Sequence, residues 1–165
     1  EKLLAVTGRS RKPQMALARE LGVTDTPCPA GGCLLTEKNF AARLRDLFAH
    51  AEQVGMRDVR LLKYGRHFRS GTAKIICGRD LAENKVLRQM RQPNEELYEL
   101  VDGPGPTVLL LGEPSPEAVQ LACDVITAYA DGQTGTLAVR RLTQRSDEVL
   151  RVRRADRESL KRFHV

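Results

Sequence analysis

The sequence predicts an α+β fold, in which a short N-terminal segment precedes a mixed β-sheet domain with packing helices. Two observations carry this prediction. Apolar residues recur at helical spacing in residues 36–51 and 115–130. After residue 57, strand-sized apolar runs occur in adjacent pairs rather than in regular alternation with helices, which favours α+β over α/β. A change of composition at residues 55–58 divides the chain into residues 1–57 and 58–165.

The N-terminal segment is expected to contain one short strand and two helices. Residues 3–6 have strand composition, and a basic turn at residues 8–12 leads into a helix that Ser10 can cap. Thr36 can cap the second helix, and Gly55 is a natural stop for it. The apolar face of this second helix consists of Phe40, Leu44, Leu47, Phe48 and Ala51.

The second segment is expected to form most of the sheet. Asp80 and Glu83 make a capping-box pattern at the start of one helix, and Ser115 with Pro116 starts another. Residues 103–106, Gly-Pro-Gly-Pro, lack the Lys-Ser/Thr of a phosphate-binding P-loop and predict a rigid turn. The basic tail predicts a solvated charged end, with non-specific RNA contact as the alternative; its residues are Arg151, Arg153, Arg154, Arg157, Lys161 and Arg162. Strands are expected at residues 59–64, 73–77, 97–101, 107–111, 137–142 and 149–152, with a turn at 65–67.

Charge and composition favour a polyanionic partner. The 165-residue chain has a formal net charge of +6 and a sequence pI near 9.4, which points to nucleic acid. Tryptophan is absent and aromatic residues make up 4%, so backbone charge should contribute more to RNA binding than base stacking does. No apolar run reaches the roughly 20 residues of a membrane span, and no signal-like segment opens the sequence. We therefore expect a cytoplasmic protein.

The stretch CPAGGC at residues 28–33 leaves several interpretations open. A zinc site usually needs four ligands, and Cys28 and Cys33 supply only one widely spaced pair, so no metal site is expected. The two thiols could form a redox-active disulfide, or could be buried in a turn. Cys33 follows two glycines and lies three residues before Thr36, where a helix N-terminus would stabilise a reactive thiolate.

Residues 33–44 resemble a segment of the tRNA 2-thiouridylases, the ATP-dependent PP-loop sulfurtransferases of the TrmU/MnmA type. The match is Cys33-Leu34-Leu35-Thr36-Glu37-Lys38-Asn39-Phe40, followed by Arg43 and Leu44. Residues 8–14 and 27–32 are similar to a thiouridylase-like subgroup of that family. The resemblance implies that residues 1–57 are the C-terminal piece of an α/β PP-loop domain and that Cys33 is the catalytic, persulfide-carrying cysteine. Cys28 is a second candidate, as the partner that resolves the persulfide.

This resemblance also implies a cofactor and two partners. The PP-loop signature Ser-Gly-Gly-x-Asp-Ser does not occur in the sequence. ATP with Mg²⁺ is therefore implied for the parent protein, no cofactor is expected in this chain, and the chain alone should not hydrolyse ATP. The implied partners are tRNA and a sulfur-donor protein.

Residues 63–68 and 74–84 resemble the RNA-binding domain of NFACT proteins. The matching phrases are Lys63-Tyr64-Gly65-Arg66-His67-Phe68 and Lys74-Ile75-Ile76-Cys77-Gly78-Arg79-Asp80, with Glu83-Asn84 behind them. The resemblance implies that residues 58–165 are an RNA-binding α+β domain. The candidate RNA contacts are Lys63, Arg66, His67 and Arg79, joined by Arg9, Arg11 and Lys12 of the basic turn.

The residues around position 79 support RNA contact on physical grounds as well. Residues 78–80 lie between a strand and a helix N-terminus, where backbone N–H groups can meet a phosphate, and Arg79 adds a bidentate donor. Tyr64 or Phe68 could stack on one base. The alternative is that Arg66 and Arg79 are solvated turn residues or pair with Asp80 and Glu83.

Three functions are compatible with these features. The first is a fragment of a tRNA-modifying sulfurtransferase that contributes a catalytic cysteine loop and an RNA-binding module. The second is a non-catalytic RNA-binding module with structural cysteines. The third is a thiol redox or protein-interaction domain that uses Cys28 and Cys33.

Overall fold

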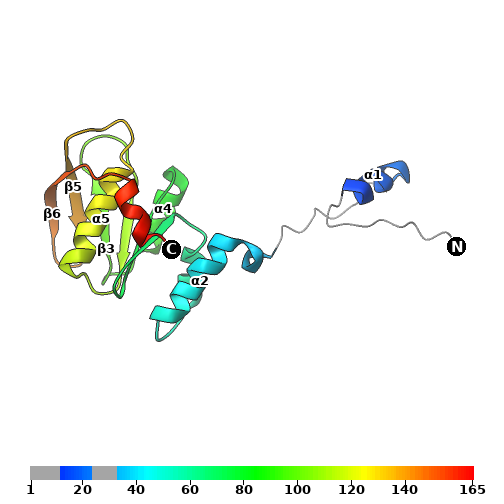
Figure 1. Cartoon of the computed structure of the whole chain (residues 1–165), viewed down its shortest axis with the longest axis horizontal. Helices are drawn as coiled ribbons and strands as arrows, with labels where there is room; N and C mark the ends of the chain where they lie inside the picture. Colours follow the sequence, from blue (N-terminus) through cyan, green and yellow to red (C-terminus); the bar gives the residue numbers. More distant parts are fainter. Residues whose placement is uncertain (1–11, 24–32) are drawn as a thin grey trace.

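The structure is a computed structural model and describes residues 12–23 and 33–165 (Figure 1). The strand expected at residues 3–6, the Ser10 cap and Cys28 lie outside the described residues. The first described helix, α1 (Lys12–Glu20), has no buried residues and ends before Gly22, as expected. None of the helices in the described parts is long and apolar enough to cross a bilayer.

The centre of the fold is a six-stranded sheet in the order β1-β2-β4-β3-β5-β6. All neighbouring strands pair antiparallel, so the expectation of a mixed sheet is corrected to an antiparallel one within an α+β fold. Five of the six expected strands are confirmed to within two residues at each end. The strands are β1 (Arg66–Ser70), β2 (Ala73–Cys77), β3 (Glu96–Leu100), β4 (Val108–Leu111), β5 (Thr136–Leu142) and β6 (Asp147–Arg153).

Helices cover both faces of the sheet (Figure 1). The long helix α5 (Pro116–Ala128) starts at the predicted Ser115 cap and packs on one face, where it forms the larger core with Tyr98 and Val139. The helix α4 (Leu81–Met90) packs on the other face through Leu87, beside Leu97. Because successive side chains of a strand point to opposite faces, neighbouring residues Leu97 and Tyr98 belong to different cores.

The helix α2 (Lys38–His50) is joined to the sheet by an apolar contact and by an ion-pair cluster. Phe40 and Leu47 pack against the buried Leu62, and the carboxylate of Asp46 accepts from Arg69 at 2.5 and 2.9 Å and from Lys74 at 2.6 Å. Burial acts to raise the pKa of Asp46, but the two cations outweigh it and hold the pKa at about 2. This helix therefore packs on strands that lie beyond the composition change at residues 55–58.

Three local expectations are wrong. Residues 59–64 do not form a strand: Met56–Leu61 is the helix α3, with Gly55 at its N-cap position. The expected turn at 65–67 is instead the start of β1. Thr36 does not cap α2, because it belongs to the short 3₁₀ helix η1 (Leu34–Thr36), and the side chain of Glu37 caps α2 by accepting from two backbone N–H groups.

The charged side chains near the end of the chain are largely exposed, as expected, but the last residues also pack onto the sheet. The 3₁₀ helix η2 (Glu158–Phe163) inserts Leu160, which is buried, into the larger core. His164 bridges to Phe68 of the edge strand β1, and the backbone N–H of Val165 donates to the carbonyl of His67 at 3.0 Å. The C-terminal residues thus cover the first edge of the sheet, whereas β6 forms the second edge.

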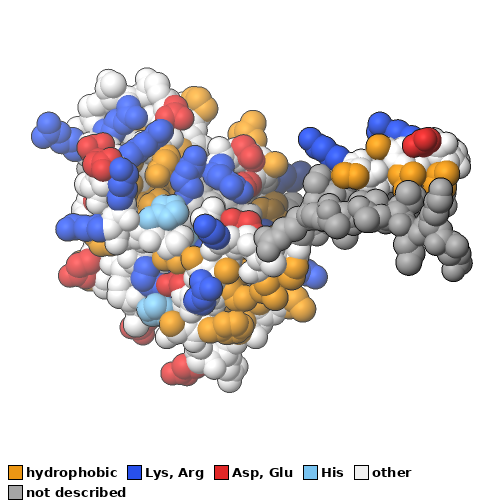
Figure 2. Space-filling view, turned by 45° about the vertical axis from the view of Figure 1, so that its right-hand side comes forward, with side chains coloured by type: hydrophobic (Ala, Val, Ile, Leu, Met, Phe, Trp, Pro, Cys, Tyr) orange, Lys and Arg blue, Asp and Glu red, His pale blue; other side chains and the backbone are white. Residues whose placement is uncertain are grey.

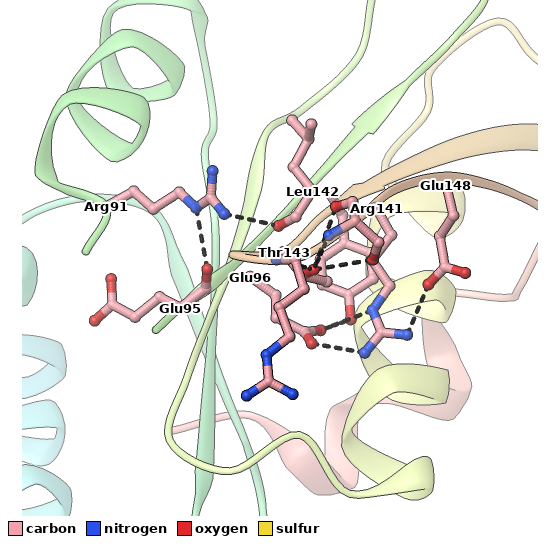
Figure 3. Close-up of polar contacts among 10 residues, drawn as sticks. Arg91, Glu95, Glu96, Arg141, Leu142, Thr143 and Glu148 are labelled. Atoms are coloured by element: carbon pink, nitrogen blue, oxygen red, sulfur yellow. Dashed lines mark hydrogen bonds and ion pairs between the residues drawn. The ribbon is translucent and has the colours of Figure 1, made fainter. Parts of the chain in front are cut away.

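A network of buried ions lies at the end of the sheet where β3 begins and β5 ends (Figure 3). Arg141 donates to both carboxylate oxygens of Glu96 at 2.6 and 2.9 Å and to Glu148 at 2.9 Å. The hydroxyl of Tyr98 donates to Glu96 at 2.6 Å, and Arg91 donates to two backbone carbonyls. The hydrogen bonds to Glu96 raise the pKa of Arg141. Arg141 is paired with Glu96 and Glu148, and the Glu95 carboxylate is paired with Arg57, so these ion pairs stabilise this end of the sheet.

Candidate nucleic-acid interface

Residues 78–84 have the pattern Gly-Arg-x-x-x-x-Asn. They connect three loops at the end of the sheet opposite to this ion-pair network. Gly78 follows β2, and a Cβ at this position would collide with the side-chain amide of Asn84. Asn84 is almost fully buried; its Oδ1 accepts from the N–H of Thr107 at 2.9 Å, and its Nδ2 donates to the carbonyl of Gly105 at 3.2 Å. Gly65 has a positive φ of 72°, and a Cβ there would lie 2.6 Å from the carbonyl oxygen of Cys77. Glycine is required at both positions.

The Gly-Pro-Gly-Pro turn is fixed from both sides, which confirms the expectation of a rigid turn. Asn84 holds it from α4, and the side-chain amide of Gln133 donates to the carbonyls of Asp102 at 3.0 Å and Pro104 at 3.3 Å. Prolines 104 and 106 offer no backbone N–H to a phosphate. The turn therefore acts as a wall rather than as an anion-binding loop.

These loops enclose an open groove of about 240 Å³, here called the Arg66 groove. The groove is lined by the turn at 103–106, by the start of α4 and by residues just past the end of α5, together with Arg66 of β1. The lining residues are Arg66, Gly78, Arg79, Asp80, Leu81, Asn84, Pro104, Gly105, Pro106, Tyr129 and Asp131.

Two arginines lie over one aromatic ring at this groove. The guanidinium carbon of Arg66 lies 4.4 Å from the ring centroid of Tyr129, and that of Arg157 lies 4.7 Å from it. Arg157 also pairs with the exposed Asp131. Arg66 has no carboxylate partner among the described residues. A half-buried aromatic ring between cations is a suitable contact for a nucleotide, because the guanidinium groups can turn to phosphates and the ring can stack on a base.

Arg79 is in part committed to an internal partner, as the alternative interpretation expected. Its guanidinium and its backbone N–H both donate to the carboxylate of Glu83, which also accepts from the N–H of Gly65. Burial acts to raise the pKa of Glu83, but these hydrogen bonds lower it, so the carboxylate stays charged. The Arg79 side chain is still 47% exposed and faces the groove, so it can reach a phosphate without leaving Glu83.

Arg43 adds to the positive field near the groove, whereas His164, with a lowered pKa, is mainly neutral at pH 7. The pKa of Arg43 is lowered by burial and then by Arg79, and that of His164 by burial and then by Arg43 and Arg66. These groups are therefore close enough to repel one another. Figure 2 shows Lys and Arg side chains gathered over the upper part of the folded body, with hydrophobic side chains more numerous below. Such a concentration of cations attracts a polyanion.

The other predicted RNA contacts lie in different places. His67 is fully buried, its Nε2 donates to the carbonyl of Tyr64 at 2.8 Å, and burial lowers its pKa well below the ordinary value. This fold thus leaves the His67 side chain no surface for a ligand. Lys63 is exposed beyond α3, and Lys12 is exposed on α1. Arg9 and Arg11 lie outside the described residues. Phe68 is buried as well.

The described cysteines fall into two classes. Cys33 is exposed and precedes η1, whereas Cys77 and Cys123 are buried. Burial raises the pKa of Cys77 to about 12 and that of Cys123 to about 11, which disfavours the reactive thiolate at both. Over residues 12–23 and 33–165, no group of three or more His, Cys, Asp or Glu side chains is placed to hold a metal ion.

Tyr129 and Arg157 are residues of the site that are missing from the candidate RNA contacts; for Tyr129 the reason is local. Its position at the end of the apolar face of α5 predicted a core residue, and it does contact the core through Phe68. The sequence does contain one indication: Tyr129 lies at the end of the helix, next to Ala130 and Asp131. A ring at such a position can remain half exposed.

A comparison with solved structures shows a similar fold. The C-terminal part of the fibronectin/fibrinogen-binding protein from Streptococcus suis matches with a TM-score of 0.55 and 15% identity, over 76% of this chain. The chain spans 60% of the length of that structure. At this identity the likeness concerns the fold alone. No curated protein matches the chain.

A family model gives a more specific result. Residues 65–164 match the model of the NFACT protein RNA-binding domain, and the matched range contains β1, all other strands and the Arg66 groove. The resemblance noted at residues 63–84 is thereby confirmed. The thiouridylase resemblance at residues 33–44 lies outside the matched range and stays a prediction. Since the match covers more than half of the sequence, the chain belongs to the family of NFACT protein RNA-binding domains.

Proposed function

We propose that this domain binds the phosphate backbone of tRNA in the Arg66 groove. The observation that carries the proposal is the placement of Arg66 and Arg157 over the ring of Tyr129, which lines a groove inside the matched RNA-binding region. Arginine binds phosphate oxygens through a planar, bidentate fork. The first turn of α4 also faces the groove and adds the positive end of a helix dipole.

The experiment is a titration with unmodified tRNA at several salt concentrations. The variant to test is the double substitution Arg66→Gln and Arg157→Gln, which removes two positive charges from the groove. We expect weaker binding, and a slope of log affinity against log salt that is smaller by about 1.4 to 1.8, because two phosphate contacts are lost. The matched control is Arg45→Gln with Arg60→Gln, which removes two exposed charges from α2 and α3.

Groove and control variants that bind tRNA equally would refute the groove as the site. Circular dichroism should show that both variants are folded, since the four side chains are partly or fully exposed. A second variant, Tyr129→Leu, tests the ring itself: it keeps an apolar side chain against Phe68 but removes a stacking surface worth about 1–3 kcal/mol per base.

We further propose that the parent protein transfers sulfur to a uridine of the bound tRNA, with Cys33 as the thiol that carries the sulfur. The support is the resemblance of residues 33–44 to thiouridylases, together with the exposure of this thiol. The same proposal includes ATP with Mg²⁺ as the cofactor of the parent protein and a sulfur-donor protein as its partner. Only the resemblance to thiouridylases supports these two. The alternative, a non-catalytic RNA-binding module, needs no reactive cysteine.

Cysteine alkylation distinguishes the two proposals. In the native protein, iodoacetamide should modify Cys33 readily, whereas Cys77 and Cys123 should react only after unfolding in urea, because they are buried and their thiolates are disfavoured. Peptide mapping by mass spectrometry measures all three sites. A native Cys33 that reacts no faster than an unfolded-state thiol would favour the non-catalytic module. Rapid alkylation of native Cys77 would contradict the burial described above.

A further inference from the structure

One face of the β5–β6 hairpin is open and carries arginines. The side chains of Val139, Leu150 and Val152 pack in the core under α5. The alternate residues of both strands must therefore lie on the opposite face. The residues paired on this face are Thr136 with Arg153, Ala138 with Arg151, and Arg140 with Val149.

Some arginines on and beside this open face form ion pairs, and two do not. Arg140 pairs with Asp147 at 3.6 Å, and Arg88 of α4 pairs with Glu99. The exposed side chains of Arg151 and Arg153 have no ion pair and no hydrogen bond with any residue that the structure describes. They lie two positions apart on one strand, about 7 Å along it, and point the same way. Beside them are only the small Ala138 and Thr136, so the surface around the two guanidinium groups is open.

The open face is continuous with the Arg66 groove. The N–H of Val101 donates to the carbonyl of Ala138 at 2.9 Å, so the turn at 103–106 begins where β5 starts. Arg154, next to Arg153, donates to the carbonyl of Gln133, and the Gln133 side chain donates to Asp102 and Pro104 of the same turn. The turn thus forms one wall of the groove and one border of the open face.

We infer that one RNA occupies both surfaces: its backbone leaves the Arg66 groove, crosses the turn at 103–106 and contacts Arg151 and Arg153 on the open face. This inference rests on the proposed RNA-binding function of the groove. The occupant is assigned by charge complementarity, because two uncompensated arginines beside a cationic groove suit phosphates and repel basic partners. The open face has no exposed aromatic ring, so the contact there is to the phosphate backbone and carries little base specificity.

The test uses the full chain and two RNA probes, unmodified tRNA and an oligonucleotide of about four nucleotides, which can fill the groove alone. In the variant Arg151→Gln with Arg153→Gln, tRNA affinity should fall by on the order of tenfold at low salt, and the salt slope should decrease by about 1.4 to 1.8. The affinity for the oligonucleotide should not change. The control is again Arg45→Gln with Arg60→Gln, near the opposite edge of the sheet.

Each outcome separates this inference from the function on which it rests. If the open-face variant binds tRNA as the control does while the groove variant is weakened, the inference is wrong and the groove stands. If the groove variant binds tRNA like the wild type, the proposed function fails and the continuous path fails with it. Equal weakening of tRNA and oligonucleotide by the open-face variant would also overturn the inference, because the effect would then not depend on RNA length.

Discussion

Gly78 and Asn84 show what a short motif does in this domain. The sequence presents them as the two ends of a phrase that suggests RNA contact, but the structure gives both a supporting role. Gly78 leaves space for the amide of Asn84, and Asn84 joins the start of α4 to the turn at 103–106. The residue of the phrase that faces the groove with a charged side chain is Arg79, which Glu83 holds in place. The motif therefore builds the groove and contributes one side chain to it.

This role predicts a specific coupling between the two ends of the motif. Gly78→Ala should destabilise the fold by about 1–3 kcal/mol, because the new methyl group displaces the Asn84 amide. Asn84→Ala should cost about 1–3 kcal/mol through unsatisfied groups at Thr107 and Gly105. In the Asn84→Ala background the glycine substitution should cost less, since its collision partner is gone. Urea unfolding of the four proteins measures the coupling, and strictly additive effects would contradict the described contact.

At the residue scale, the sequence predicts helix caps more reliably than contacts between side chains that are distant in the chain. Asp80 and Ser115 cap α4 and α5 as predicted, because a cap depends on neighbours in the chain. The sequence predicts that Glu83, three residues after Asp80, completes a capping box. Its carboxylate instead accepts hydrogen bonds from Arg79 and Gly65. The contact of Tyr129 with Arg66 and Arg157 joins β1, α5 and the C-terminal segment. Such long-range contacts leave no local pattern in the sequence.

At the scale of elements, the errors have a common physical cause. Residues 59–64 contain apolar residues spaced closely enough for a strand, yet Leu61 and Leu62 are both buried because they face different clusters at the end of a short helix. The C-terminal segment is rich in arginine, and this composition predicts a segment that lies in solvent. One apolar residue, Leu160, together with main-chain pairing to β1, is enough to dock it. In both cases tertiary packing overrides the local pattern.

The attachment of α2 predicts a pH dependence of stability. The pKa of Asp46 is about 2 in the folded protein against 3.8 for the unperturbed group. A lowered folded pKa stabilises the native state above pH 3.8, and this contribution, about 2 kcal/mol, is lost as the pH falls toward 2. Asp46→Asn should therefore lower the free energy of unfolding at pH 6, and the difference from wild type should shrink between pH 4 and pH 2.

Urea unfolding across this range measures the difference directly. The matched control is Asp102→Asn, at an exposed position whose carboxylate makes no ion pair in the described part of the chain. A difference between wild type and Asp46→Asn that is constant with pH would mean that the Asp46 carboxylate gains nothing from Arg69 and Lys74. The same experiment tests whether α2 is a working part of this domain, since both cations belong to the sheet.

At the scale of the whole molecule, the sheet separates two kinds of charged surface. At one end the buried network of Arg141, Glu96 and Glu148 is internally paired (Figure 3). At the other end, Arg66 in the groove and Arg151 and Arg153 on the open face have no carboxylate partner among the described residues. The excess of six positive charges in the sequence predicted a polyanion but not its location. The location of the surface for a polyanion depends on which Lys and Arg side chains the fold pairs with carboxylates. The register of the strands determines this pairing.

The most direct measurement of the central claim is a map of amide chemical shifts in the 18.4 kDa chain during titration with unmodified tRNA. The account predicts that the largest changes fall on Arg66, residues 78–81, the non-proline residues of 103–107, and residues 129–131, with smaller changes on β6. Changes concentrated on α2 and α3, or spread evenly over the surface, would contradict the assignment of the Arg66 groove as the RNA-binding site.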